Sequence, residues 1–386
     1  MTTVVFFISG HGFGHASRQV EVINALGRLT GPDLRVIIRS GVSPSLLART
    51  IRVPFELRTG VCDTGLVQTN SVTQDDRATL DAARDFYTTF DDRVRLETAA
   101  LADDQPSVVV CDIAPLGLAV GAALGVPSIL IANFTWDWIY ERQAGFAAEA
   151  PDVLASIRRA QSLATLTLKL PLSPSFDGSG LRDIRPLPLI ARRPSRARAD
   201  TRALFGLPAN RRLALLSFGG YGLSELDLTR VDCADEWDLV VTDRGVCDRT
   251  LASLPHVHAL SESMLAGSVA RYEDLIAAAD AVITKPGFGI LGECITASTP
   301  MLYTSRGDFR EYDILVAEMP RYLRSQFISQ EDLFAGRWKR ALAALVAQPT
   351  PTETLPPTGA EIAADIIFSR SAHTPAGNSG PPTDAR

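Results

Sequence analysis

The chain has 386 residues, of which 46% are hydrophobic, and a formal net charge of −6 at pH 7. This length exceeds that of an ordinary single domain and predicts two domains. The negative charge argues against a nucleic-acid-binding protein. The sequence has no apolar run of about 20 residues that would span a membrane, although peripheral membrane contact is left open. Five scattered cysteines without a C-x-x-C pair, together with a start that lacks a basic leader, indicate reduced thiols and a cytoplasmic protein.

Short apolar runs alternate with helical patterns through the first half of the chain. The runs predict strands at residues 4–8, 36–38, 53–57, 107–112, 127–132 and 163–170, the last of which is the final strand expected in the first domain. Helical spacing predicts a helix after the first strand, a short one near residues 43–50, and one long helix over residues 75–102. This alternation is typical of a parallel sheet covered by helices.

Residues 171–198 are rich in proline and arginine, which indicates a linker with a boundary near residues 188–194. A second series of strands follows at residues 212–218, 237–241, 257–260, 281–284 and 300–303, with a helix near 359–369. Two such halves predict two facing, doubly wound, Rossmann-like α/β domains with a cleft between them, over residues 1–188 and 189–350. Residues 371–386 have a composition typical of a disordered tail.

The first strand runs into a glycine-rich turn, SGHGFGHASR at residues 9–18, which leads into a helix. Gly12 and Gly14 allow a tight turn and close approach of a ligand to the backbone, and the helix N-terminus attracts anions. His11 and His15 are unusual in such a turn. Because the positive field of a helix N-terminus disfavours imidazolium, a histidine there tends to stay neutral and is a candidate general base.

Two other interpretations of this turn compete. In a dinucleotide-binding G-x-G-x-x-G motif the third glycine lies where His15 stands, and an acidic residue is expected after the second strand, which instead runs into Arg39. The arginine leaves an NADP-binding variant open. The other interpretation is that the histidines only cap the turn.

A second strand, glycine turn and helix occupies residues 283–293, ITKPGFGILGE. Its backbone N–H groups, with Lys285 nearby, could hold a diphosphate. The amides in question are those of Gly287, Phe288 and Gly289. Glu293 lies nearly two helical turns further on, where its carboxylate could accept hydrogen bonds from a ribose. The alternative is a buried glutamate favoured by the helix dipole.

Three further segments follow predicted strands at the edge where open α/β sheets bind ligands. A charged loop covers residues 304–313, aromatic residues crowd at 133–138, and Gly219 and Gly220 offer another backbone anion site.

The stretches GHGFGHASRQVEV, NFTWDWIY and residues 284–311 resemble the GT-B glycosyltransferases, including family 28 with the peptidoglycan N-acetylglucosaminyltransferase. They resemble most specifically the N-terminal glycosyltransferase-like region of plant L-arabinokinases and its stand-alone bacterial relatives. The resemblance covers about residues 4–327 and implies two facing Rossmann-like domains, with residues 351–370 forming a helix that crosses back to the first. The chain lacks the P-x-x-x-G-L-x-S-S phosphate loop of the kinase domain, so sugar kinase activity is not implied.

The resemblance also implies roles for individual residues. His15 corresponds to the proposed base, Asp112 to the aspartate that orients it, Gly287 to the phosphate-binding glycine and Glu293 to the ribose-binding glutamate, whereas His11 is additional. Asp308 and Glu311 lie near the D-Q or Q-Q pair that contacts donor-sugar hydroxyls, but no glutamine is present here, so the donor sugar is left open. The residues expected on the acceptor side are Asn133, Trp136 and Asp137.

The implied activity is an inverting transfer from a nucleoside-diphosphate sugar, with a UDP-sugar as the expected co-substrate, to an unidentified hydroxyl acceptor. No permanently bound cofactor and no metal are expected. One alternative is a nucleotide-sugar hydrolase or epimerase, because Gly12, Gly14, His15 and Arg18 also fit a G-x-G-H-x-x-R pattern. The other is a non-catalytic protein that binds a sugar nucleotide.

Overall fold

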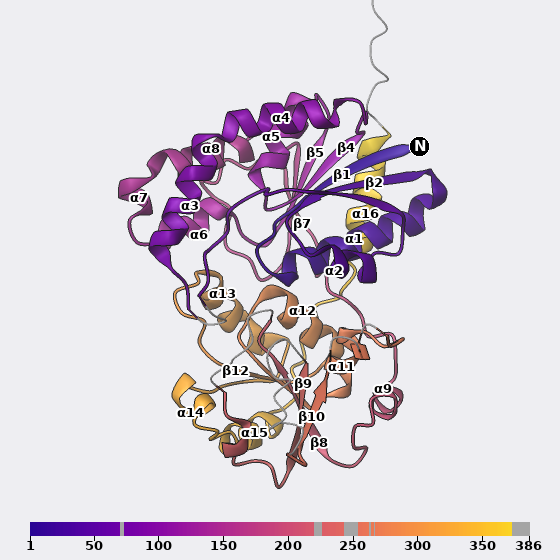
Figure 1. The fold of residues 1–386 in the computed structure, drawn as a ribbon, viewed down its shortest axis with the longest axis vertical. Coiled ribbons are helices and arrows are strands. Elements are labelled where there is room, and N and C mark those ends of the chain that lie inside the picture. The colour runs from indigo at the N-terminus through magenta and orange to yellow at the C-terminus, as the bar shows by residue number, and fades with distance from the viewer. Residues whose placement is uncertain (70–72, 220–225, 243–253, 262–263, 266, 373–386) are drawn as a thin grey trace, which may run out of the picture.

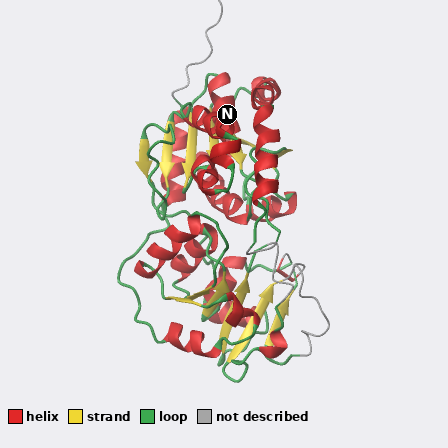
Figure 2. Cartoon of the chain, turned by 90° about the vertical axis from the view of Figure 1, so that its left-hand side faces the viewer, coloured by secondary structure: helices red, strands yellow, loops and turns green. Residues whose placement is uncertain are grey.

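The computed structural model describes residues 1–69, 73–219, 226–242, 254–261, 264–265 and 267–372. The described chain forms two lobes, each built on its own parallel β-sheet (Figures 1 and 2). Within these ranges no helix combines the length and the apolar composition needed to cross a bilayer. Cys62, Cys111, Cys233 and Cys294 are buried free thiols, and Cys247 lies outside the described residues.

The first sheet has seven parallel strands in the order β3-β2-β1-β4-β5-β6-β7. Their bounds are Thr2–Ile8 (β1), Leu34–Ser40 (β2), Phe55–Thr59 (β3), Val108–Asp112 (β4), Ser128–Ala132 (β5), Leu166–Lys169 (β6) and Ile184–Pro186 (β7). β1, β4 and β5 are apolar at nearly every position because helices cover both faces of the sheet. Val4 and Phe6 of β1 pack in one core with Val22 of a helix, whereas Val5 and Phe7 pack in a second core on the opposite face.

The helices of this lobe alternate with its strands. They are α1 (Phe13–Thr30), α2 (Pro44–Thr50), α3 (Asp76–Thr88), α4 (Phe90–Ala102), α5 (Pro115–Ala123), α6 (Trp136–Arg142), α7 (Phe146–Glu149) and α8 (Pro151–Gln161). In Figure 1, α1 and α2 lie on one side of the sheet, and α4, α5 and α8 lie on the other.

The second sheet has six parallel strands in the order β10-β9-β8-β11-β12-β13. They are β8 (Arg212–Ser217), β9 (Trp237–Thr242), β10 (Val257–Leu260), β11 (Ala281–Thr284), β12 (Met301–Tyr303) and β13 (Ser325–Phe327). The helices are α9 (Arg198–Leu204), α11 (Tyr272–Ala278), α12 (Phe288–Ala297), α13 (Glu311–Glu318), α14 (Gln330–Phe334) and α15 (Lys339–Val346). The predicted fold of two doubly wound α/β domains is therefore confirmed. The strand order reverses between β1 and β4 in one sheet and between β8 and β11 in the other, which is where such sheets bind ligands.

The last helix, α16 (Gly359–Ser371), belongs to the first lobe although it follows the second in sequence (Figure 1). Ala363 and Ile367 of α16 pack in the same core as Val22 of α1. At its start, the Gly359 N–H donates a hydrogen bond to the Leu189 carbonyl, 3.0 Å away. Of the predicted tail at 371–386, residues 373–386 lie outside the described residues.

Three details of the predicted elements are wrong. The long helix expected over residues 75–102 is interrupted at Thr89, whose φ of −106° and ψ of 20° separate α3 from α4. β7 lies within the expected linker and extends the first sheet beyond the strand that was expected to close it. β13 was not expected at all. Both missed strands have only three residues, and β7 is exposed at a sheet edge, so neither carries a buried apolar run.

Candidate active site at the domain boundary

The two glycine turns meet at the boundary between the lobes. Gly12, with φ of 87°, precedes α1, and Gly287 precedes α12. A Cβ added to Gly289 would lie 3.0 Å from Gly14 Cα, and one added to Gly14 would lie 3.6 Å from the Gly289 nitrogen. The N-terminal ends of α1 and α12 therefore abut, as the sequence predicted for two turns that leave the carboxyl ends of parallel strands.

Positive charge accumulates where these helix ends meet. Neither α1 nor α12 has an acidic residue in its first turn or a side-chain hydrogen bond at its N-cap, so neither helix offsets the field of its own N-terminus. Burial, followed by repulsion from Arg306, lowers the pKa of Lys285 from 10.5 to about 7. Burial also lowers the pKa of Arg306, against the opposing effect of Glu311. This combination favours the binding of an anion.

His15 and Asp112 form a buried pair in the first lobe. His15 lies in the first turn of α1, Asp112 is the last residue of β4, and their side chains are 9% and 0% exposed. His15 Nδ1 lies 2.9 Å from Asp112 Oδ2. Arg18, one helical turn further along α1, donates from Nε to Asp112 Oδ1 at 2.6 Å. Burial by itself would raise the pKa of Asp112, but Arg18 and His15 together hold it below its ordinary value.

His15 Nδ1 lies between an acceptor and a donor. It is 2.9 Å from Asp112 Oδ2 and 2.9 Å from Arg18 Nη2. With a proton on Nδ1 the ring donates to Asp112, whose buried Oδ2 has no other hydrogen-bond donor among the described residues, whereas without that proton Nδ1 accepts from Arg18. The first tautomer leaves Nε2 as the acceptor nitrogen, which is the state that a general base requires.

His11 lies beside aromatic side chains, next to the His15–Asp112 pair. Its ring centroid is 5.3 Å from that of Trp136 and 6.4 Å from those of His15 and Phe309. Burial is the largest cause that lowers the pKa of His11 well below its ordinary value, followed by repulsion from His15, Arg306 and Lys285. His11 is therefore neutral near pH 7.

Asp63 holds the first glycine turn against α6, a role that was not predicted. Its Oδ1 accepts a hydrogen bond from Ser9 Oγ at 3.0 Å, and its Oδ2 accepts one from Trp136 Nε1 at 2.8 Å. Burial raises the pKa of Asp63 from 3.8 to about 6. Asp63 follows the partly exposed strand β3 by four positions, and its place after a strand is the only signal that the sequence offered.

Two of the expected substrate-binding residues contact each other across the boundary. Asn133 follows β5 and Glu311 begins α13, and Asn133 Nδ2 donates to Glu311 Oε1 at 2.5 Å. Arg18 Nη1 donates to Asn133 Oδ1 on the other side of the amide. Arg306, which lies within the charged loop singled out in the sequence, is 3.4 Å from Glu311 Oε2 and stacks over the Phe309 ring at 3.9 Å.

Glu293 is buried on α12 and paired within the protein. Arg192 Nε donates to Glu293 Oε1 at 2.6 Å, and Arg192 Nη1 lies 3.3 Å from Glu273 Oε2. Burial raises the pKa of Glu293, while Arg192 opposes that rise. The burial considered in the sequence is therefore observed, and the ribose contact stays a prediction.

The structure describes three of the four remaining residues that were expected to bind the nucleotide sugar. Asp308 is half exposed and pairs with Arg142 of the first lobe at 2.7 Å. Gly219 follows β8 with φ of 74°, at the same sheet edge as Lys285. Phe288 is buried, and Arg18 lies 5.7 Å from its ring centroid. Gly220 lies outside the described residues.

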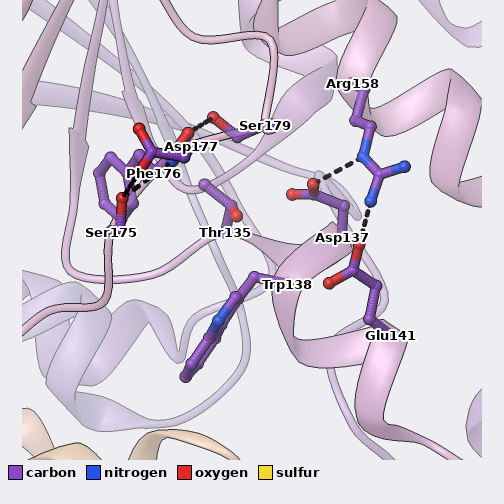
Figure 3. Close-up of a pocket in the computed structure, with 10 residues that line it drawn as sticks. Thr135, Asp137, Trp138, Glu141, Arg158, Ser175, Phe176, Asp177 and Ser179 are labelled. Carbon is purple, nitrogen blue, oxygen red and sulfur yellow. Dashed lines mark hydrogen bonds and ion pairs between the residues drawn. The ribbon is translucent and has the colours of Figure 1, made fainter.

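Asp137 lines a different pocket. Its Oδ2 accepts from Arg158 Nε and its Oδ1 from Gln161 Nε2, both at 3.0 Å. Figure 3 shows this pocket of about 220 Å³ between α6, α8 and the loop around Phe176, with Trp138 at its lower side. Asp137 therefore belongs to this pocket, whereas Asn133 and Trp136 lie beside the His15–Asp112 pair.

The sequence was compared with family models and with known proteins. No family model matches the chain. The chain is 27% identical over 372 residues to L-arabinokinase of Arabidopsis thaliana, a match that covers 94% of this chain and 34% of that protein. The chain thus spans about a third of the length of this relative.

Solved structures of glycosyltransferases match almost the whole chain. The glycosyltransferase of kitacinnamycin superposes with a TM-score of 0.64 at 21% identity, covering 96% of this chain and 99% of that one. UGT2 of Phytolacca americana, solved with UDP-2-fluoroglucose and pterostilbene, gives 0.61 at 13% identity, covering 96% and 94%. VinC, solved with DTDP, gives 0.55 at 16% identity, covering 96% of each chain. The resemblance found in the sequence is confirmed at the level of the fold: the chain has the GT-B fold of these glycosyltransferases.

Proposed function

We propose that this protein is an inverting glycosyltransferase that moves a sugar from a nucleoside-diphosphate sugar to a hydroxyl acceptor without a bound metal. A UDP-sugar is the first donor to test, since one structural neighbour was solved with UDP-2-fluoroglucose and another with DTDP. The name of the Arabidopsis relative describes a protein of which this chain matches only 34%, and the chain lacks the kinase phosphate loop.

One observation carries the proposal: a His–Asp pair lies beside two abutting helix N-termini whose first turns hold no acidic residue, with Lys285 and Arg306 nearby. A diphosphate needs positive charge around its oxygens as it leaves. Lys285, Arg306 and the amides that begin α12 provide it, which is the contribution that a divalent cation would otherwise make. An acceptor hydroxyl needs a base, and the acceptor nitrogen of His15 meets that need.

The proposed reaction is a single displacement. His15 Nε2 takes the proton of the acceptor hydroxyl as its oxygen forms a bond to the anomeric carbon. The bond from that carbon to the diphosphate oxygen breaks, and its electron pair leaves with the diphosphate. Attack from the face opposite the leaving group inverts the anomeric configuration. Asp112 holds the His15 tautomer and stabilises the imidazolium that forms.

The experiment is a two-part assay of the purified protein. Thermal stabilisation by a panel of nucleotides and nucleotide sugars identifies the donor, and nucleoside-diphosphate release is then measured with and without candidate hydroxyl acceptors. Acceptor-dependent release supports transfer. Release at full rate without acceptor would replace transfer by hydrolysis, and binding without release would indicate a non-catalytic sugar-nucleotide-binding protein. No stabilisation by any nucleotide would contradict all three.

A further inference from the structure

A continuous chain of buried polar contacts runs from the His15–Asp112 pair into the second lobe. Within the first lobe, Arg18 joins Asp112 to Asn133. This series of polar contacts crosses from the first lobe to the second through one hydrogen bond, from Asn133 Nδ2 to Glu311 Oε1 at 2.5 Å. On the far side, Arg306 Nη1 lies 3.4 Å from Glu311 Oε2 and donates to the Pro286 carbonyl at 3.3 Å, immediately before the glycine turn of α12.

The three side chains that carry the contacts across the boundary are buried, and the amide between them has one orientation. Arg18, Asn133 and Glu311 are 3%, 0% and 4% exposed. The Asn133 amide presents its oxygen to the Arg18 guanidinium and its NH₂ group to the Glu311 carboxylate. The reversed orientation would set donor against donor and acceptor against acceptor, so the two charges fix the amide.

We propose that Asn133 and Glu311 are positioning residues that form an interdomain latch, through which closure of the second lobe fixes Arg18 and thereby the orientation of the His15–Asp112 pair. This inference rests on the proposed function, because it makes His15 an effective base only when the lobe that carries the diphosphate site is closed. Glu311, expected from the resemblance to contact donor-sugar hydroxyls, then contributes to turnover through Asn133 instead.

Because the orientation of the Asn133 amide is known, substitutions can first remove the hydrogen bond to Glu311 and then restore it with donor and acceptor exchanged. Asn133→Asp sets two carboxylates against each other and should lower kcat roughly tenfold to a hundredfold, the range expected for losing a hydrogen bond to a charged group. Glu311→Gln keeps an oxygen for the Asn133 amide and should lower kcat by less than about fivefold. In the double variant Asn133→Asp/Glu311→Gln, the introduced glutamine donates to the introduced aspartate, so kcat should recover to the level of Glu311→Gln alone.

Glu311→Ala breaks the latch without adding a charge, which covers the case in which Asn133→Asp fails to fold. It should lower kcat roughly tenfold while the KM for the donor changes less than about twofold. A raised donor KM with unchanged kcat would instead assign Glu311 to donor binding and overturn the latch. Asp313→Asn is the matched control, because Asp313 makes an exposed pair across the same boundary with Arg142 but does not touch the chain of contacts, and its kcat should equal that of the wild type.

Small-angle X-ray scattering tests the latch without any turnover. Asn133→Asp and Glu311→Ala should increase the radius of gyration of the full chain, and the double variant should return it to the wild-type value. If the wild type turns over no nucleotide sugar but the scattering changes and recovers as stated, the latch stands and the proposed function fails. Equal radii in all variants, or an Asn133→Asp defect that the double variant does not rescue, would overturn the latch.

Discussion

Gly14 and Gly289 touch across the domain boundary so closely that a Cβ on Gly289 would lie 3.0 Å from Gly14 Cα. The atom it would meet belongs to the backbone and cannot rotate away. Because both glycines lie in the first turns of facing helices, their contact sets how far apart the N-termini of α1 and α12 lie, and hence the strength of the combined helix field at the proposed diphosphate site.

Gly289→Ala should therefore push the two helix ends apart. We expect at least a tenfold loss of turnover, since small displacements of reacting groups can cost up to about a hundredfold. Gly14→Ala is the matched comparison, because its Cβ would lie at an ordinary contact distance of 3.6 Å and should cause a smaller loss. Steady-state kinetics and nucleotide-sugar affinity measured on both variants check this order. Equal behaviour of the two would mean that the contact does not control the site.

Removal of the His15 side chain should separate catalysis from donor binding. His15→Ala should lower turnover by roughly 10²–10⁴, with donor affinity nearly unchanged because the side chains proposed to bind the diphosphate, Lys285 and Arg306, lie in the second lobe. Asp112→Asn should have an intermediate effect, since it disturbs the tautomer but keeps the base. His11→Ala should cost less than either, because His11 lies against aromatic rings and pairs with no carboxylate in the part of the chain that the structure describes. Wild-type activity in His15→Ala, with or without acceptor, would refute the assignment of the base.

Lys285 should make nucleotide affinity depend on pH near neutrality. With a pKa of about 7 in the free protein, it is charged below pH 7 and neutral above, so affinity for a nucleoside diphosphate should fall as pH rises from 6 to 8.5. Burial lowers the pKa of His11 well below its ordinary value, away from this window. Isothermal titration calorimetry in buffers of different ionisation enthalpy should show proton uptake on binding at pH 8, and Lys285→Met should abolish both effects.

Lys285 should also make folding stability depend on pH, but stability should rise with pH whereas nucleotide affinity falls. Its pKa is about 7 in the folded chain against 10.5 for the ordinary value, so between these values the unfolded chain binds more protons. The contribution of Lys285 to stability therefore rises with pH above 7. Urea unfolding of the wild type between pH 7 and 8.5 should show this slope, and Lys285→Met should flatten it. If the free energy of unfolding has the same pH slope in the variant, the Lys285 amine is solvated in the folded protein.

Glu293 can be tested for its two roles separately. Removing one partner of a buried ion pair costs about 3–5 kcal/mol. Because Arg192 keeps Glu273 as a second partner, Glu293→Ala should lower the free energy of unfolding by less than this. If Glu293 also binds the ribose, the wild type should prefer a nucleotide to its 2′-deoxy or 3′-deoxy form by roughly tenfold to a hundredfold, and Glu293→Gln should reduce that preference. A preference that is the same in both proteins would leave Glu293 with a structural role alone.

The sequence by itself determined the fold class and the two turns that build the site. The spacing of apolar residues is a local property of the sequence, so strands and helices could be predicted from it. The loops at the carboxyl ends of parallel strands lie at one edge of a sheet, so the contact between residues 9–18 and residues 283–293 could also be predicted. The pairing of His15 with Asp112 was implied by the family resemblance, and the neighbouring positions of β1 and β4 in the sheet account for it.

Only the tertiary structure decided which polar groups are partners. Asn133 and Glu311 are 178 positions apart, Ser9 and Asp63 are 54 apart, and no periodicity connects either pair. Glu293 has the position of a ligand-binding residue in sequence, yet burial against Arg192 gives it a partner within the protein. A buried charge must find an opposite charge or a donor nearby, and where that partner lies depends on how the two lobes and the segment between them pack, which residue spacing along the chain does not encode.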